Sequence, residues 1–186
     1  PERSLGVGGV ALWFWRATTV DDVVAARRCG GAVGVGLCVR GGGTNMIVAG
    51  GGVDALVLQV AIRGIDCSRQ GASTSLRLGA GEPWDDAVSA AVSRGLAGVE
   101  CLSGIPGSAG GTPVQNVGAY GQEVAQTVAE VTAIDRESGE VVRLRGRECG
   151  FEYRTSRFKG EDDGRFIVCE VLFELSARPP TLEYPD

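Results

Sequence analysis

Residues 101–121 contain six glycines and two prolines, so neither a helix nor a strand can run through them. Glycine permits positive φ and lets main-chain N–H groups come close to a ligand. Ile105, Val114, Val117 and Tyr120 are spaced along the run and could anchor it, which argues against disorder. Because long loops inside compact domains are usually functional, a ligand-binding loop is one interpretation. A solvent-exposed connection is the other.

A second glycine-rich segment directly follows an apolar run at residues 35–39. It reads Arg40-Gly41-Gly42-Gly43-Thr44-Asn45. A glycine-rich loop that follows a strand can bind a phosphate through its main-chain N–H groups. A tight β-turn fits the same residues. The segment matches neither the P-loop nor the dinucleotide-binding fingerprint, because the lysine of the first and the third glycine of the second are absent.

Composition narrows the possible partners. The 186 residues are 44% hydrophobic and carry a net charge of −5 with no basic stripe, so we expect a soluble chain that does not bind nucleic acid. No apolar run reaches membrane-spanning length, and no signal-peptide pattern is present. We therefore expect a cytoplasmic protein without a membrane partner.

Cysteine and histidine usage narrows the chemistry. The chain has six cysteines without a C-x-x-C pair and has no histidine, so we expect neither a metal site nor a Cys-His nucleophile. The thiols are expected to be free and mostly buried. Any acid or base has to come from another residue type.

The periodicity of apolar residues predicts an α+β fold. Thr19 is placed to cap a first helix that Gly30 and Gly31 end. Strands are expected at residues 10–15 (buried), 35–39, 55–60, 75–81 and 166–175, and a hairpin at 124–135 and 140–144. Helices are expected at 20–29 and 82–94, the second opened by Glu82, Pro83 and Trp84 and with Ala87, Val88, Ala91 and Val92 on one face.

Residues 148–160 combine cationic and aromatic side chains. Arg154, Arg157 and Lys159 surround Ser156. They could form a cationic pocket or a solvated charged turn.

Four blocks together resemble the UDP-N-acetylenolpyruvoylglucosamine reductase family. The first two are residues 41–45 and 79–84. The third is residues 95–124, which include Gly104-Ile105-Pro106-Gly107-Ser108 and Gln115-Asn116-Val117-Gly118-Ala119-Tyr120-Gly121, and the fourth is residues 148–159. The similarity extends from about Leu5 to Tyr184, nearly the whole chain.

This resemblance implies the FAD-binding fold of the vanillyl-alcohol-oxidase or PCMH type. Residues 1–62 would form one FAD-binding subdomain and residues 63–178 a second, with FAD held tightly between them. Residues 179–186 would link to the family's C-terminal domain, which is missing from this chain. Because the chain begins at Pro1 and ends in an extended tail, we expect a fragment, and a monomer.

The resemblance also implies which residues bind the cofactor. A glycine-rich segment would hold the FAD pyrophosphate, and the central run together with the last strand would line the flavin. The first set is Gly41, Gly42, Gly43, Thr44 and Asn45, and the second is Ile105, Pro106, Gly110, Gly111, Thr112, Gly118 and Val168.

The implied activity is the reduction of UDP-N-acetylglucosamine enolpyruvate to UDP-N-acetylmuramate for peptidoglycan, with NADPH as the hydride source and FAD as the carrier. Tyr120, Arg154 and Tyr184 would face the substrate. Arg154 would be catalytic, because a fixed guanidinium can stabilise the enolate-like carboxylate that hydride addition leaves.

Two departures from the family pattern bear on this activity. Thr155 stands where the family usually has aspartate beside the key arginine. The family's proton-donating serine belongs to the missing domain, so the chain alone is expected to be inactive. A flavin-binding module without catalysis and an FAD oxidase of the same fold are the alternatives.

Overall fold

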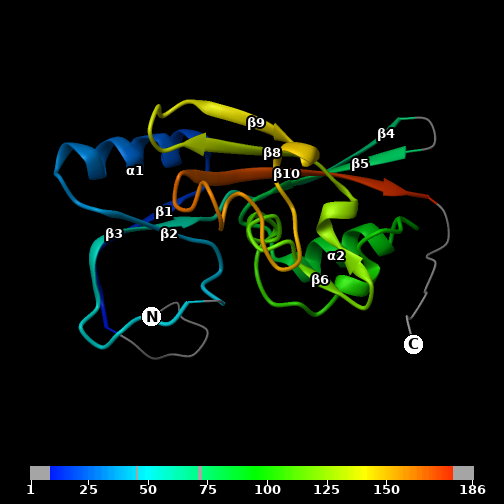
Figure 1. Cartoon of the computed structure of the whole chain (residues 1–186), viewed down its shortest axis with the longest axis horizontal. Helices are drawn as coiled ribbons and strands as arrows, with labels where there is room; N and C mark the ends of the chain where they lie inside the picture. Colours follow the sequence, from blue (N-terminus) through cyan, green and yellow to red (C-terminus); the bar gives the residue numbers. More distant parts are fainter. Residues whose placement is uncertain (1–8, 45, 71–72, 178–186) are drawn as a thin grey trace.

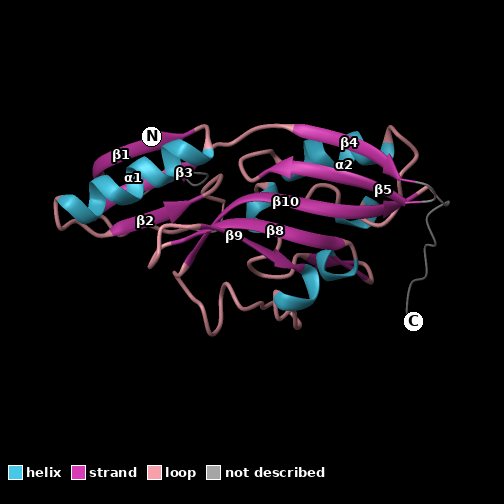
Figure 2. Ribbon diagram, turned by 90° about the horizontal axis from the view of Figure 1, so that it is seen from above, coloured by secondary structure: helices cyan, strands magenta, loops and turns pink. Residues whose placement is uncertain are grey.

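Two β-sheets lie side by side in the computed structural model, which describes residues 9–44, 46–70 and 73–177 (Figure 1). The smaller sheet has the order β1-β3-β2, and both neighbouring pairs are parallel. Helix α1 lies across one face of this sheet (Figure 2). The elements are β1 (Ala11–Ala17), α1 (Val20–Ala32), β2 (Leu37–Arg40) and β3 (Val53–Val60).

The larger sheet is antiparallel, has the order β4-β5-β10-β8-β9, and packs against α2 and several 3-10 turns. Its strands are β4 (Ile65–Gln70), β5 (Ser73–Gly79), β8 (Val128–Asp135), β9 (Val141–Arg145) and β10 (Phe166–Ser176). The other elements are α2 (Trp84–Val92), the short pair β6 (Gly118–Ala119) and β7 (Gln122–Glu123), and the 3-10 turns η1 (Glu100–Leu102), η2 (Ala109–Gly111), η3 (Val124–Gln126) and η4 (Gly146–Glu148).

Helix α1 begins where the sequence predicts and ends later. Thr19 Oγ1 accepts a hydrogen bond from the main-chain N–H of Asp22 at 3.1 Å, and the Asp22 carboxylate accepts one from the N–H of Thr19 at 3.0 Å, so the two residues form a capping box. The expectation that Gly30 and Gly31 end the helix is wrong. Gly30 is buried against the sheet, where an added Cβ would lie 3.4 Å from the Val35 carbonyl oxygen. Gly30 therefore allows helix α1 to pack closely against the chain at Val35 and does not end the helix.

Strand β1 is not the buried strand that its apolar sequence suggests. Leu12, Trp13 and Phe14 are 59%, 51% and 49% exposed. The strand lies at the edge of its sheet, and α1 covers only one face, so most of its large side chains have no layer to pack against.

The remaining element predictions hold with small changes. Strands β2, β3, β5, β8, β9 and β10 lie where the apolar runs predict, but β4 was not predicted, because its sequence lacks alternation. Helix α2 ends at Val92, which is 50% exposed and not on the buried face, and the hairpin strand starts at Val128 because residues 124–126 form a 3-10 turn.

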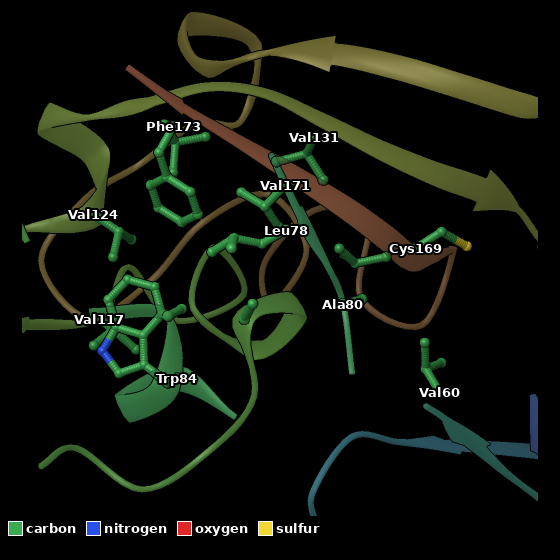
Figure 3. Packing of buried hydrophobic residues seen from close by; sticks show 14 of the residues in the cluster. Val60, Leu78, Ala80, Trp84, Val117, Val124, Val131, Cys169, Val171 and Phe173 are labelled. Atoms are coloured by element: carbon green, nitrogen blue, oxygen red, sulfur yellow. The ribbon is translucent and has the colours of Figure 1, made fainter. Parts of the chain in front are cut away.

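The buried side chains form one hydrophobic cluster that is continuous across both sheets. At its centre the rings of Trp84 and Phe173 lie 5.6 Å apart, near Val117 and Val124 (Figure 3). The indole N–H of Trp84 donates to the carbonyl of Leu102 at 2.9 Å, so its polar atom is satisfied inside the core.

The sheets join where the chain leaves β3 and passes β5. An added Cβ on Gly79 would lie 2.5 Å from the Ile62 carbonyl oxygen, and one on Gly81 would lie 2.5 Å from the Ala61 carbonyl carbon. Buried Glu82 accepts the N–H of Gly64 at 2.7 Å. Only glycine permits this backbone contact.

All six cysteines are free thiols, as expected. The expectation that most are buried is wrong, since only Cys149 and Cys169 are. Burial raises the pKa of each of these two thiols to about 12. In the described part of the chain, no helix is long and apolar enough to cross a membrane.

Asp135 organises the turn between β8 and β9. Its carboxylate accepts the main-chain N–H of Glu137 at 2.8 Å and receives the guanidinium of Arg165, also at 2.8 Å. The hydrogen bond from Arg165, followed by those from the turn, holds the pKa of Asp135 below its ordinary value. The carboxylate therefore stabilises the fold only when ionised.

We expect Asp135→Asn to destabilise the protein at neutral pH by removing this ionised partner. A depressed folded-state pKa means that the contribution is complete above the unfolded-state pKa of about 3.9 and is lost as the pH falls below it. The difference in unfolding free energy between wild type and variant, measured by urea denaturation, should shrink between about pH 5 and pH 2. A constant difference over that range would contradict the assignment.

Candidate functional site

A cavity of about 230 Å³ lies between the glycine-rich loop after β2 and the central glycine-rich run. Its walls come from two segments about sixty residues apart in sequence, one from each side of the junction between the sheets. The lining residues are Val39, Arg40, Gly41, Gly42, Gly43, Thr44, Met46, Trp84, Ile105, Pro106, Gly107, Ser108, Gly111, Thr112, Val114, Gln115 and Val117.

The central run is a folded wall and not an exposed connection. Residues 107–110 bond to the chain after β5: Trp84 N–H donates to the Gly107 carbonyl at 3.1 Å, and Gly110 N–H donates to the Ala80 carbonyl at 2.9 Å. An added Cβ on Gly110 would lie 2.5 Å from Ala80 Cβ. Thr112 is 2% exposed. Of the two interpretations of residues 101–121, the solvent-exposed connection is therefore excluded and the ligand-binding loop remains.

The opposite wall is a cradle of three consecutive glycines, residues 41–43. An added Cβ on Gly41 would lie 2.5 Å from Ser108 Oγ, whereas one on Gly42 would meet only Thr44 Cγ2 at 4.0 Å. Gly43 has φ +75°, which favours glycine. The loop after β2 therefore approaches the central run so closely that only glycine fits at position 41. Gly42, in contrast, leaves room for a ligand.

Arg40 places a guanidinium at this cradle, a role that was not predicted from the sequence. Its guanidinium lies 5.9 Å from the centre of the Phe14 ring, and its Nε donates to the Gly41 carbonyl at 3.3 Å. It precedes the three glycines directly, and that position next to a phosphate cradle is the signal that could have identified it.

The structure brings together most of the predicted cofactor residues. Gly41, Gly42, Gly43, Thr44, Ile105, Pro106, Gly111 and Thr112 line the cavity. Gly110 lies behind the wall against Ala80, and Val168 is buried in β10. Asn45 and Tyr184 lie outside the described residues. The cofactor roles of all these residues stay predictions.

A second cavity, of about 320 Å³, contains both remaining substrate candidates, Tyr120 and Arg154, together with Gly118. Arg154 belongs to a tight turn in which Glu152 and Thr155 exchange main-chain hydrogen bonds of 3.1 and 3.2 Å. The other lining residues are Ala119, Gly121, Gln122, Glu123, Gln126 and Tyr153.

Asn116, Tyr120 and Arg154 are the non-glycine residues with positive φ in the described chain, at +45°, +51° and +56°. Such conformations cost on the order of 1–3 kcal/mol each and tend to occur at functional sites. Tyr120 and Arg154 line the second cavity, and Asn116 lies directly beneath it. This clustering makes the second cavity a candidate functional site.

The side chain of Asn116 connects the segments that carry Tyr120 and Arg154. Its amide nitrogen donates to the Glu123 carboxylate at 2.7 Å and to the Glu152 carbonyl at 3.0 Å, while its oxygen accepts the N–H of Ala125 at 3.1 Å. Asn116 is 1% exposed. It therefore holds both turns in place from beneath the cavity.

The three cationic residues predicted at 154–159 do not converge. Arg157 forms an ion pair with Asp162 at 2.6 Å and lies over the Phe166 ring, while Lys159 donates to the Arg154 carbonyl at 3.3 Å. Neither lines the second cavity, so a three-cation pocket is not formed. Among the described residues, no carboxylate lies within ion-pair distance of Arg154, so the position of Thr155 beside it leaves the guanidinium without an acidic partner.

The fold and the glycine cradle define a class of protein. Residues 11–145 match the family model of the FAD binding domain, and the chain belongs to that family. The expected FAD-binding fold of the vanillyl-alcohol-oxidase or PCMH type is confirmed: 6-hydroxy-D-nicotine oxidase of Arthrobacter nicotinovorans, only 22% identical, superposes with a TM-score of 0.67 over 90% of this chain and 37% of that one.

The more similar relatives are named UDP-N-acetylenolpyruvoylglucosamine reductase, which confirms the family resemblance found in the sequence. The chain is 50% identical over 94% of its length to UDP-N-acetylenolpyruvoylglucosamine reductase of Streptomyces coelicolor, of which it covers 44%. A crystal structure of the enzyme so named from Thermus caldophilus is 29% identical with a TM-score of 0.78, over 96% of this chain and 60% of that one. The chain spans about half the length of the curated relatives it matches.

We expect Asn116→Asp and Asn116→Gly both to lower the unfolding free energy by about 1–3 kcal/mol, because buried partners lose their hydrogen bonds. Aspartate cannot donate to Glu123 or Glu152, whereas glycine tolerates positive φ but bonds to neither. Asn116→Ala should cost more than Asn116→Gly, since alanine adds backbone strain. Denaturant titration measures all three, and a glycine variant as stable as wild type would refute the role of the side chain.

Proposed function

We propose that this chain is the FAD-binding part of a reductase that converts UDP-N-acetylglucosamine enolpyruvate to UDP-N-acetylmuramate, with NADPH as the hydride donor. The observation that carries the proposal is the glycine-walled cavity between residues 41–44 and 105–112, where the main chain is open to a ligand at Gly42. The similarity to enzymes of that name supports the choice of substrate.

The first cavity would hold the cofactor. Main-chain N–H groups around Gly42 and the guanidinium of Arg40 offer positive partners for a pyrophosphate. Ile105 and Pro106 offer an apolar wall for a planar ring. Bound FAD would supply the hydride transfer between NADPH and the enolpyruvyl double bond.

The second cavity would hold the substrate. The Arg154 guanidinium would bind the enolpyruvyl carboxylate and stabilise the charge that accumulates there on reduction. Its turn and the segment carrying Tyr120 are held in position by Asn116, so both side chains approach the substrate from a fixed base. Such preorganisation avoids a reordering cost during the reaction.

Several finer assignments belong to the same proposal. Residues 1–62 and 63–178 would be the two FAD-binding subdomains, and residues 179–186 would lead toward a C-terminal domain. The enzyme would be a cytoplasmic monomer that serves peptidoglycan synthesis, cell shape and cell division. The proton donated to the product would come from that further domain, so the chain by itself would bind FAD without turnover.

The purified chain should bind FAD and become yellow, with a flavin absorbance spectrum that dialysis of denatured protein removes. Gly42→Val should weaken FAD binding without loss of thermal stability, because its side chain would extend into the cavity. Gly51→Val, at a turn position with nothing within 4 Å of the added Cβ, is the matched control and should bind FAD normally. A wild-type chain that refuses FAD would disprove the proposal.

In a chain that includes the C-terminal domain, Arg154→Lys should lower kcat by about 10²–10³-fold with FAD still bound, because lysine cannot form two parallel hydrogen bonds to a carboxylate. Arg147→Lys, on the exposed turn η4, is the control and should leave kcat unchanged. Steady-state assays of NADPH oxidation measure both. Flavin binding without turnover in the wild type would instead favour a non-catalytic module.

A further inference from the structure

Arg27 and Arg136 cross-link the two sheets on the side away from their backbone junction. Arg27 on α1 donates through Nε to the Arg136 carbonyl and through Nη2 to the Glu137 carbonyl, both at 2.7 Å. In return, Arg136 donates through Nη2 to the Leu37 carbonyl at the start of β2, at 3.0 Å. The bonded residues are 99 to 110 positions apart in sequence. We call Arg27 and Arg136 the arginine clasp.

The clasp lies at an open cavity of about 510 Å³ on the surface. Both arginines line it, together with Arg28 and residues from the end of α1 to the start of β2. Neither clasp guanidinium has a carboxylate within ion-pair distance among the described residues. Their bonds to neutral carbonyls are therefore the direct connection between the sheets at this place.

The turn that receives Arg27 is held by hydrogen bonds of its own. Asp135 accepts the N–H groups of Glu137 and Ser138, and its main-chain carbonyl accepts the N–H of Gly139 at 2.8 Å. An added Cβ on Gly139 would lie 2.6 Å from Arg27 Nη1. The guanidinium is thus seated tightly against a turn that cannot easily give way.

The clasp holds the strand that leads into the cofactor cradle. Leu37 begins β2, and Gly41 follows its end, a distance of about 13 Å along an extended strand. The opposite wall of the cavity is bonded to the larger sheet through Ala80. The separation of the walls therefore depends on how the smaller sheet is held against the larger one.

We propose that Arg27 and Arg136 are positioning residues that set the width of the cofactor cavity by holding α1 and β2 against the β8–β9 turn. This inference rests on the proposed function insofar as the ligand is FAD. Without the clasp, the sheets would remain joined only at their backbone junction and core. If the width of the cavity varies, a smaller fraction of the molecules can bind FAD at any moment. The apparent dissociation constant for FAD then rises as that fraction falls.

The first test is FAD titration of the whole chain at a temperature well below unfolding. Arg27→Gln, Arg136→Gln and the double variant should raise the dissociation constant, the double by about tenfold or more. Arg28→Gln is the matched control, because Arg28 is adjacent in α1, lines the same cavity, and its side chain donates no hydrogen bond to the described residues. Unchanged affinity in the double variant would overturn the proposal.

The second test needs no ligand, so it separates failure of the clasp from failure of the proposed function. Spin labels on the exposed Cys29 of α1 and Cys67 of β4, with Cys38 and Cys101 replaced by serine, report the distance between the sheets. The wild type should give a narrow distribution and the clasp variants a broad one. Merely lowered stability would not broaden it, and a narrow distribution in the double variant would refute the clasp.

A glycine pair tests the same contact from the opposite side. Gly139→Ala would displace Arg27, whereas Gly34→Ala has nothing within 4 Å of its Cβ, and both positions have positive φ, +80° and +65°. Backbone strain is therefore matched. Weaker FAD binding and a broader distribution for Gly139→Ala alone are expected, and equal behaviour of the two would overturn the proposal. This pair also carries the test if the double arginine variant does not fold.

Discussion

The contact between the backbone at residues 79–81 and the backbone at 61–62 is the constraint on which the other features depend. It leaves no space for a side chain at Gly79 or Gly81, and the Glu82 carboxylate secures it through the N–H of Gly64. This contact fixes where the smaller sheet meets the larger one. The loop after β2 consequently faces the central run, and the walls of the first cavity belong to different sheets.

Strained backbone conformations are concentrated around the second cavity. The non-glycine residues with positive φ in the described chain, Asn116, Tyr120 and Arg154, belong to one hydrogen-bonded unit. The structure retains these conformations because the Asn116 amide, buried in the protein, satisfies three partners at once. Two cavities result, one with main-chain donors and the other with a guanidinium that has no acidic partner in the described chain.

Local chemistry explains which parts of the site were predictable. The glycines at residues 41–44 and 105–112 indicated close backbone approach, but a tight turn or an exposed loop fitted them as well, and the resemblance to a known family assigned them to the cofactor. Arg40 and the clasp arginines were missed, since their roles depend on partners that are remote in sequence or become near only on folding. The exposure of Trp13 and Phe14 was missed for a related reason: apolar content predicts a strand, but burial depends on whether a layer covers it.

Which glycines are required depends on distant partners, such as Ile62 for Gly79 and Ser108 for Gly41. The sequence placed the helix cap at Thr19 and most of the strands, because these depend on neighbours within a few residues. It also restricted the chemistry, since the chain has no histidine. The three-dimensional fold alone shows that Arg154 reaches the second cavity while Arg157 pairs with Asp162. The two arginines are three positions apart in the same loop. Side-chain direction and long-range partners, which no local pattern encodes, separate their roles.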